Sequence, residues 1–263
     1  MTQAIDTPMN AIRESDAYRG RNTSMGALIE EADRIFEALA SGQTREEVKQ
    51  RCFSGDVLRQ RTEKSRRRIW ASIQHRYFAH EVSWVIDDLV SAKREDRKAF
   101  LDLLYIHYCL RDKLAFDVVN KLIWGSGLSV RGVIVPHDVR HLLDDAASDQ
   151  PHIARWSEST RAKLANSVLT ALRDFELLEG KARKQVAGRT ISNHAAEHVV
   201  HLLVSEGQRG RSIITDSTWH LFLMSERDVS GKLSVLASEH KLRFEKTGST
   251  VVLETPSEWE AGS

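Results

Sequence analysis

Apolar residues recur at intervals of three and four positions along most of this chain, which is the spacing of one face of an α-helix. Residues 25–40 show the pattern most clearly, with apolar side chains at Leu28, Ala32, Ile35, Phe36 and Leu39. The 263 residues include only 14 glycines and 4 prolines, the two residue types that most disfavour a helix interior. We therefore expect a mainly α, multi-helix globular fold whose apolar stripes pack into a buried core.

Residues 27–79 predict a short helix between two longer ones. A Ser-Gly pair ends the helix of residues 25–40, and Thr44 begins a second helix with Glu47 three positions later, the spacing of a capping box. The long helix that follows has one apolar stripe, formed by Ile69, Trp70, Ile73 and Tyr77. This order is that of a tri-helical DNA-binding unit, so we expect a first helix-turn-helix here.

The middle of the chain predicts a helical scaffold. Amphipathic helices are expected over residues 81–93, 96–110 and 112–124, and a Gly-Ser-Gly sequence then ends the series. A linker is expected from this sequence to Pro136.

The next part of the chain repeats the helical order and adds a basic ribbon. Helices are expected over residues 137–147 and 151–156, followed by a longer helix that begins at Ser157 or Ser159. The basic segment 181–186 comes next. Helix, short helix, long helix and ribbon is the order of a winged helix-turn-helix.

The last part of the chain predicts further helices and a small C-terminal β-hairpin. The helices are expected over residues 192–206, 218–224 and 229–240. Residues 242–245 and 250–254 alternate in polarity around a Lys-Thr-Gly-Ser turn, which is typical of a hairpin. The residues after it are expected to fray.

These elements predict three segments. We expect a flexible N-terminal tail over residues 1–23, a helical domain with the first helix-turn-helix over 24–125, and the second, winged unit with its helical extension and hairpin over 126–263. A shift of 99 residues aligns the two long helices and pairs Lys64 with Lys163, although any two amphipathic helices align this well.

One segment of the chain is strongly basic, although the formal net charge of the whole chain is only +1. Residues 59–68 include six basic residues and one acidic one, at the end of the helix that enters the major groove in a helix-turn-helix. Basic side chains neutralise phosphates, hydroxyls bond phosphate oxygens, and arginine can fork onto guanine. The candidate DNA contacts are Arg59, Arg61, Thr62, Lys64, Ser65, Arg66, Arg67 and Arg68. The alternative interpretation is a solvated helix face.

A second candidate set lies at the start of the later long helix and in the basic ribbon after it. Its members are Ser159, Thr160, Arg161, Lys163, Lys181, Arg183 and Lys184. Small hydroxyl residues beside cations suit phosphate and base-edge contacts. An ordinary helix cap with exposed charges would have the same composition. The short basic segment 209–212 is interpreted as an exposed linker.

The sequence predicts no catalytic or metal site. Cys52 and Cys109 lie among apolar residues and outside any CxxC pair, so buried, reduced thiols are expected. Several histidines are spaced for one helix face, but without an HExxH order, so a structural or surface role is expected. These are His137, His141, His194, His198 and His201. Residues 179–181 resemble part of a nuclease motif without its strand context, and no phosphate-binding loop or GxSxG is present. We therefore expect no enzyme activity and no cofactor.

No apolar run is long enough to span a bilayer. The best stretch, residues 103–110, is short and interrupted by His107, and the first residues include no apolar segment typical of a signal peptide. The cytoplasm is the expected location, with no membrane partner.

Four stretches of the chain resemble the BrxA family of BREX phage-exclusion systems. Residues 28–42 with the basic helix 62–77 are similar to the start of that family, and "WSESTRAKLANSVLTALRDFELLEG" (156–180) and "TDSTWHLFLMSERDV" (215–229) are similar to later parts. The resemblance covers roughly residues 24–255.

The resemblance implies a nearly all-helical protein with two helix-turn-helix units, placed here at Arg59–Arg68 and Ser159–Lys163. Such a protein would bind double-stranded DNA and assist a defence system that methylates host DNA and blocks foreign DNA. Its partners would then include other BREX proteins, such as the methyltransferase and ATPase components. The expected C-terminal hairpin departs from a purely helical fold.

Two other functions fit the same residues. A helical adaptor would dock its basic patches onto acidic surfaces of partner proteins. A winged-helix transcriptional regulator would need sequence preference and, usually, a symmetric dimer, for which we find no dimerisation helix.

Overall fold

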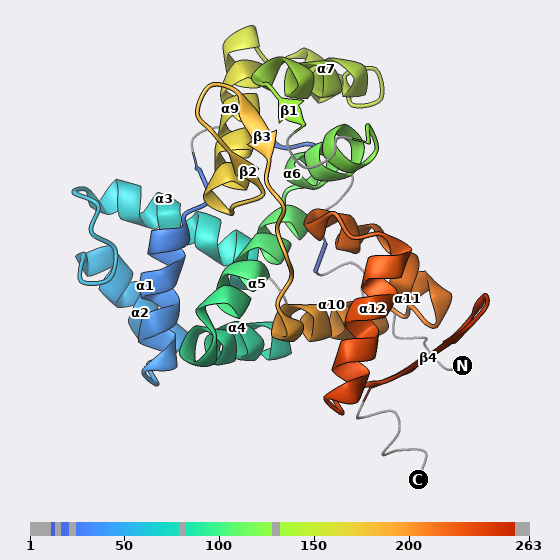
Figure 1. The fold of residues 1–263 in the computed structure, drawn as a ribbon. Helices are drawn as coiled ribbons and strands as arrows, with labels where there is room; N and C mark the ends of the chain where they lie inside the picture. The colour runs from blue at the N-terminus through green and yellow to red at the C-terminus, as the bar shows by residue number, and fades with distance from the viewer. Residues whose placement is uncertain (1–11, 14–16, 21–24, 79–82, 128–131, 256–263) are drawn as a thin grey trace, which may run out of the picture.

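The computed structural model describes residues 12–13, 17–20, 25–78, 83–127 and 132–255. Helices dominate these ranges, so the expected mainly α fold with a small C-terminal hairpin is confirmed (Figure 1). The α-helices are α1 (Ile29–Ala40), α2 (Arg45–Ser54), α3 (Glu63–Ile73), α4 (Ser83–Glu95), α5 (Arg97–Leu110), α6 (Lys113–Asp117), α7 (Pro136–Ala146), α8 (Pro151–Ala154), α9 (Glu158–Asp174), α10 (Asn193–Ser205), α11 (Arg211–Thr215) and α12 (Glu226–Ser238). The π-helical turns are η2 (Gln74–Phe78) and η3 (Val118–Trp124), and the 3-10 helix is η4 (Ser217–Phe222).

Side-chain caps fix where several of these helices begin. The predicted capping box at α2 is confirmed, because the Thr44 hydroxyl accepts a hydrogen bond from the Glu47 amide while the Glu47 carboxylate accepts one from the Thr44 amide. Asp96 and Asp112 cap α5 and α6 in a similar way, each accepting bonds from two amides of the first turn.

Helix α5 lies in the middle of the molecule. In Figure 1, α1–α4 lie on one side of it and α10–α12 on the other, with α7, α9 and the small sheet above. Every α5 residue from Ala99 to Leu110 is buried except Leu101. The mostly apolar composition of residues 103–110 thus reflects the burial of α5 inside the protein. No helix among the described residues is long and apolar enough to cross a membrane.

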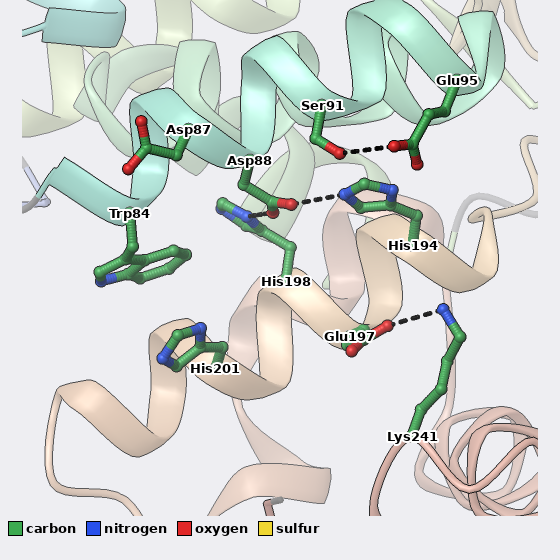
Figure 2. A pocket seen from close by; sticks show the side chains of 10 residues that line it. All are labelled: Trp84, Asp87, Asp88, Ser91, Glu95, His194, Glu197, His198, His201 and Lys241. Carbon is green, nitrogen blue, oxygen red and sulfur yellow. Dashed lines mark hydrogen bonds and ion pairs between the residues drawn. The ribbon is translucent and has the colours of Figure 1, made fainter. Parts of the chain in front are cut away.

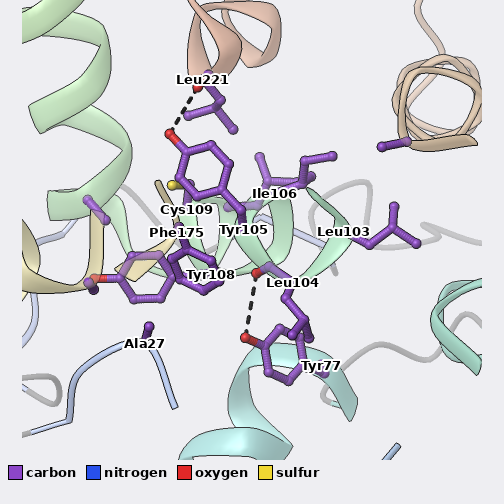
Figure 3. Packing of buried hydrophobic residues seen from close by; sticks show 14 of the residues in the cluster. Ala27, Tyr77, Leu103, Leu104, Tyr105, Ile106, Tyr108, Cys109, Phe175 and Leu221 are labelled. Carbon is purple, nitrogen blue, oxygen red and sulfur yellow. Dashed lines mark hydrogen bonds between the residues drawn. The ribbon is translucent and has the colours of Figure 1, made fainter. Parts of the chain in front are cut away.

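Aromatic rings from distant segments pack around α5 (Figure 3). Phe175, which follows α9, lies 5.5 Å from the ring of Tyr105 and 5.3 Å from that of Tyr108, measured between centroids. The Tyr105 hydroxyl donates to the carbonyl of Leu221 at 3.0 Å, so this buried phenol has a partner. One hydrophobic cluster thus joins the parts of the chain that carry α3 and α9.

Three short strands form an antiparallel sheet in the order β1-β3-β2 beside α9. The strands are β1 (Val133–Ile134), β2 (Leu178–Glu179) and β3 (Lys184–Val186). Val133 pairs with Gln185, and Gln185 pairs in turn with Glu179. The C-terminal hairpin is formed by β4 (Arg243–Thr247) and β5 (Thr250–Glu254), in the place that the sequence predicts.

Part of the N-terminal stretch, expected to be a flexible tail, packs on the helices. Tyr18 is 2% exposed, and its hydroxyl donates to Asp117 at 2.7 Å. Arg13 forms an ion pair with Glu206 at 2.7 Å. Residues 1–11, 14–16 and 21–24 lie outside the described residues, as do parts of the expected linker (128–131) and the last eight residues.

Three segments differ from the regular helices expected for them. The long helix expected to run through Tyr77 is α-helical to Ile73 and continues as the π-helical turn η2. Residues 112–124 divide into α6 and the π-helical η3, and the segment expected to be a helix over 218–224 is the 3-10 helix η4. Asp216 caps η4 by accepting from the Thr218 amide at 2.8 Å, and Leu223, with φ of 55°, ends it. The six residues between this cap and the left-handed Leu223 form two turns of the tighter 3-10 helix.

Candidate nucleic-acid interface

The amino end of α3 carries most of the first predicted basic cluster. Thr62 is its N-cap, since its hydroxyl accepts from the Ser65 amide at 3.2 Å, and the two hydroxyl oxygens lie 2.9 Å apart. The exposed cations here are Arg59, Arg61, Lys64, Arg67 and Arg68, which we call the α3 patch. Thr62 and Ser65 are exposed as well, but their hydroxyls are engaged with each other.

Arg66 and Arg67 of this cluster both have partners within the protein. Arg66 folds back onto the preceding segment and donates to the carbonyls of Phe53 (2.9 Å) and Gln60 (2.8 Å). Arg67 forms an ion pair with Glu63 at 2.6 Å, and its guanidinium lies 4.2 Å from the centroid of the Phe53 ring. The structure thus gives Arg66 a role in packing α3 against α2.

The amino end of α9 has the same construction. Ser157 is its N-cap and accepts from the Thr160 amide at 3.2 Å, with the two hydroxyls 2.9 Å apart. Arg161 pairs with Asp144 of α7 at 2.6 Å and also reaches the carbonyl of Ala154 in α8. Ser159 and Lys163 are exposed on the outer face of the helix.

The loop between β2 and β3 presents two of the three predicted cations. Lys181 and Arg183 are exposed, whereas Lys184 is only 5% exposed and donates to the Lys181 carbonyl at 3.0 Å. Burial lowers the pKa of Lys184. The loop turns at Gly180, where φ is +92° and an added Cβ would lie 2.5 Å from the Arg183 carbonyl oxygen. Only glycine fits this turn.

The two helix starts align with a shift of 95 residues rather than 99. Counting from the caps Thr62 and Ser157, both units have glutamate at the first helical position, a hydroxyl residue at the third and an arginine at the fourth that folds back. The buried positions also correspond: Ile69, Trp70, Ile73 and Tyr77 match Leu164, Ala165, Val168 and Leu172. The cap geometry, which periodicity alone does not reveal, sets the correct register.

Asn166, which is not among the residues singled out from the sequence, is exposed one turn beyond Lys163 on α9. It lies seven positions after Ser159, so helical spacing puts the two on the same face. That spacing was the available signal, but an exposed asparagine within a helix has no distinctive neighbours in the sequence.

A separate pocket of about 500 Å³ contains the histidines of α10 (Figure 2). Asp88 of α4 lies between two of them: it accepts from His194 Nε2 at 2.5 Å and from His198 Nδ1. His198 Nε2 lies 2.9 Å from His107 Nε2, and His201 stacks on Trp84 at 4.2 Å between ring centroids.

The charges in this pocket stabilise one another. Hydrogen bonding to Asp88 raises the pKa of His194. Burial would raise the pKa of Asp88, but the hydrogen bonds from His194 and His198 lower it well below its ordinary value. Both nitrogens of His198 are engaged, so it has none left for a metal ion. Within the described ranges, no group of three or more histidine, cysteine or carboxylate side chains is arranged to hold a metal.

The remaining candidates have structural surroundings. The rings of His137 and His141 contact each other at 4.3 Å between centroids. Cys52 and Cys109 are buried free thiols, as predicted, and burial raises the pKa of Cys52 to about 12. The basic segment 209–212, interpreted as a linker, is only partly one, because Arg211 and Ser212 begin α11. Arg209 donates to the carbonyl of Val204, and Arg211 pairs with Glu226 at 2.9 Å.

Comparison with known proteins gives one family and one fold. The profile of the BrxA family matches residues 16–207. The crystal structure of an uncharacterized protein from Magnetospirillum magneticum is similar in fold, with a TM-score of 0.56 and 15% sequence identity over 73% of this chain and 98% of that chain. No curated protein matches the sequence.

Proposed function

The chain belongs to the BrxA family, and from this premise we propose that it is a non-enzymatic double-stranded DNA-binding protein of a BREX phage-defence system. It contacts DNA through the amino ends of α3 and α9. The observation that carries the proposal is the repeated construction of these two ends: a short helix, a hydroxyl cap, an arginine tied back to the preceding segment, and exposed cations beyond it.

The element order supports two helix-turn-helix units in this proposal. In the first, α2 precedes α3; in the second, α7 and α8 precede α9. The small sheet β1-β3-β2 and the loop with Lys181 and Arg183 would then serve as the wing of the second unit. A helix-turn-helix inserts the start of its second helix into the major groove, while cations around it bond phosphates. We therefore propose α3 and α9 as the recognition helices.

The charge distribution supports a polyanionic partner. The formal net charge is +1, yet the α3 patch concentrates five cations in ten residues. Of these, Arg67 is partly neutralised by Glu63. Localised positive charge on an otherwise balanced protein binds phosphates without attracting nucleic acid to the whole surface.

The histidine pocket has a structural role in this proposal. Asp88 accepts a hydrogen bond from His198, and the other ring nitrogen of His198 lies 2.9 Å from the buried His107. We propose that these contacts join α4, α5 and α10, and that the protein works in the cytoplasm, where the DNA is.

Fluorescence polarisation with a labelled random-sequence duplex at low salt tests the proposal. Lys64→Glu and Lys163→Glu should each weaken binding by roughly tenfold, because each removes one phosphate contact and adds repulsion. Arg227→Glu on α12 is the matched control, since Arg227 is also exposed but lies outside both proposed helix-turn-helix units. Equal weakening by all three variants would contradict the proposed surface.

A second candidate is an adaptor for other BREX proteins. Residues 208–255 lie beyond the family match and form α11, η4, α12 and the hairpin. This extension exposes two large apolar side chains, Val235 (45%) and Val252 (39%). Capture of a BREX methyltransferase or ATPase component by the intact chain, lost in Val235→Asp/Val252→Asp but not in Lys64→Glu, would favour this role.

A further inference from the structure

We infer that the two units make different kinds of contact with DNA: α9 reads base edges through Asn166, while Lys163 and the cations of α3 bind the phosphate backbone. The inference rests on the proposed function. It specifies which of the two units gives the protein a preference for particular base sequences. It comes from comparing residues at equivalent positions of the two helices.

The register of 95 residues makes this comparison direct. Counting from each cap, the second, fifth, sixth and ninth helical positions face outward. In α3 they are Lys64, Arg67, Arg68 and Ala71, all exposed. In α9 they are Ser159, Ala162, Lys163 and Asn166, of which only Ala162 is half-buried. The two faces have the same geometry but different chemistry.

The α3 face is built from long cations and one methyl group. Lysine and arginine side chains neutralise phosphates whatever the base sequence. Arg67 is held by Glu63 and lies over Phe53, so its guanidinium is directed along the protein surface. At these four positions α3 offers no side chain that both donates and accepts hydrogen bonds.

The α9 face has shorter side chains at these positions, and one of them can distinguish between bases. Ser159 and Ala162 are short, so the helix backbone can approach the floor of a groove closely. Lys163 can neutralise a phosphate beside the groove, whereas an asparagine amide matches the N6 and N7 atoms of adenine with one donor and one acceptor. Asn166 is the outward-facing residue with that donor and acceptor pair.

Asn166 is held in a way that permits this contact. Its amide nitrogen donates to the carbonyl of Ala162, one turn earlier, at 2.8 Å. The side chain is exposed, so rotation about its own bonds can exchange that local hydrogen bond for a bidentate pair with adenine. Arg161, by contrast, is held by Asp144 and Ala154, so it positions α9 against α7 and α8.

Selection from a pool of duplexes with a randomised central segment tests the division of work. The wild-type chain should enrich a short motif and discriminate against single-base changes in it by about 5- to 100-fold. Asn166→Ala should lose the preference at one or two positions, yet bind unselected duplex within about threefold of wild type. Lys64→Ala should bind all duplexes more weakly and still enrich the same motif.

Ala71→Asn, at the equivalent position of α3, is the matched control and should leave the motif unchanged. Thermal melts confirm that each variant folds. A wild-type chain that binds the pool without enriching a motif overturns the inference and leaves the proposed function standing. Loss of the motif in Lys64→Ala, with retention in Asn166→Ala, overturns it as well. No binding to any duplex at low salt refutes the proposed function itself.

Discussion

The fully buried carboxylate of Asp102 accepts a hydrogen bond from the guanidinium of Arg189 at 2.5 Å. It also accepts from the Ser192 amide at 2.8 Å and from Lys98 at 2.9 Å. Asp102 belongs to the central helix α5, whereas Arg189 and Ser192 lie in the segment that joins β3 to α10. This contact thus fixes the path of the chain from the second unit back into the helical body.

Removing the charge of Asp102 should destabilise the protein strongly. In Asp102→Asn the guanidinium of Arg189, 6% exposed, would remain buried without its counter-ion. We expect a loss of about 3–5 kcal/mol in the free energy of unfolding, measured by urea denaturation. Asp145→Asn, at an exposed position on α7, should stay within about 0.5 kcal/mol of wild type. Equal effects of the two variants would show that the Asp102 contact is not structural.

Lys64 and Arg66, two residues apart in α3, should differ in what they contribute. Arg66→Met loses two hydrogen bonds to the carbonyls of Phe53 and Gln60, so we expect the free energy of unfolding to fall by about 1–3 kcal/mol. Lys64→Met, at an exposed position, should alter stability by less than about 0.5 kcal/mol and weaken DNA binding. Thermal melts and polarisation titrations of both variants separate the two roles, and a reversed pattern would contradict them.

Gly180 and Gly231 should respond in opposite ways to alanine. Gly180→Ala forces a side chain into a positive-φ turn with the Arg183 carbonyl oxygen 2.5 Å away, at a cost of at least about 1–3 kcal/mol. Gly231 lies within α12 with no atom within 4 Å of an added Cβ, so Gly231→Ala should stabilise the protein by about 0.5–1 kcal/mol. Urea denaturation gives both values; a Gly180→Ala variant as stable as wild type would exclude the tight turn.

His194 and His220 should make opposite contributions to the pH dependence of stability. Bonding to Asp88 raises the pKa of His194 above 6.5, so its stabilisation is present below pH 6.5 and is lost as pH rises through the higher, folded value. Burial lowers the pKa of His220, so protonation below pH 6.5 favours the unfolded chain.

His194→Gln should therefore destabilise the protein more at pH 5.5 than at pH 8. His220→Gln should destabilise it less at pH 5.5 than at pH 8. Free energies of unfolding at the two pH values check both statements. Parallel pH dependence in the two variants would rule out the opposite signs.

Much of the fold could be predicted from the sequence because it depends on local signals. Helical periodicity gave the helix positions, and the spacing of Thr44 and Glu47 gave the cap of α2. The Lys-Thr-Gly-Ser turn located the C-terminal hairpin. The central position of α5 was not predicted, because only the contacts of all its neighbours show that it is buried on every side.

The candidate site was predicted less completely, because a charged residue in a sequence does not reveal its partner. Arg66 and Lys184 belong to basic segments, but one bonds carbonyls of the preceding segment and the other is buried in the sheet. Asp88 is separated from His194 by 106 positions, so their ion pair has no local signal in the sequence.

The salt dependence of duplex binding tests the central claim most directly. We would measure the association constant by fluorescence polarisation at several salt concentrations, for wild type, Lys64→Glu, Lys163→Glu and Arg227→Glu. The account predicts tight binding at low salt, a steep linear fall of log K with log salt, and a slope reduced by about one in each of the first two variants but not in the third. A wild-type chain that does not bind duplex DNA at low salt, or whose slope is unchanged by Lys64→Glu and Lys163→Glu, would contradict it.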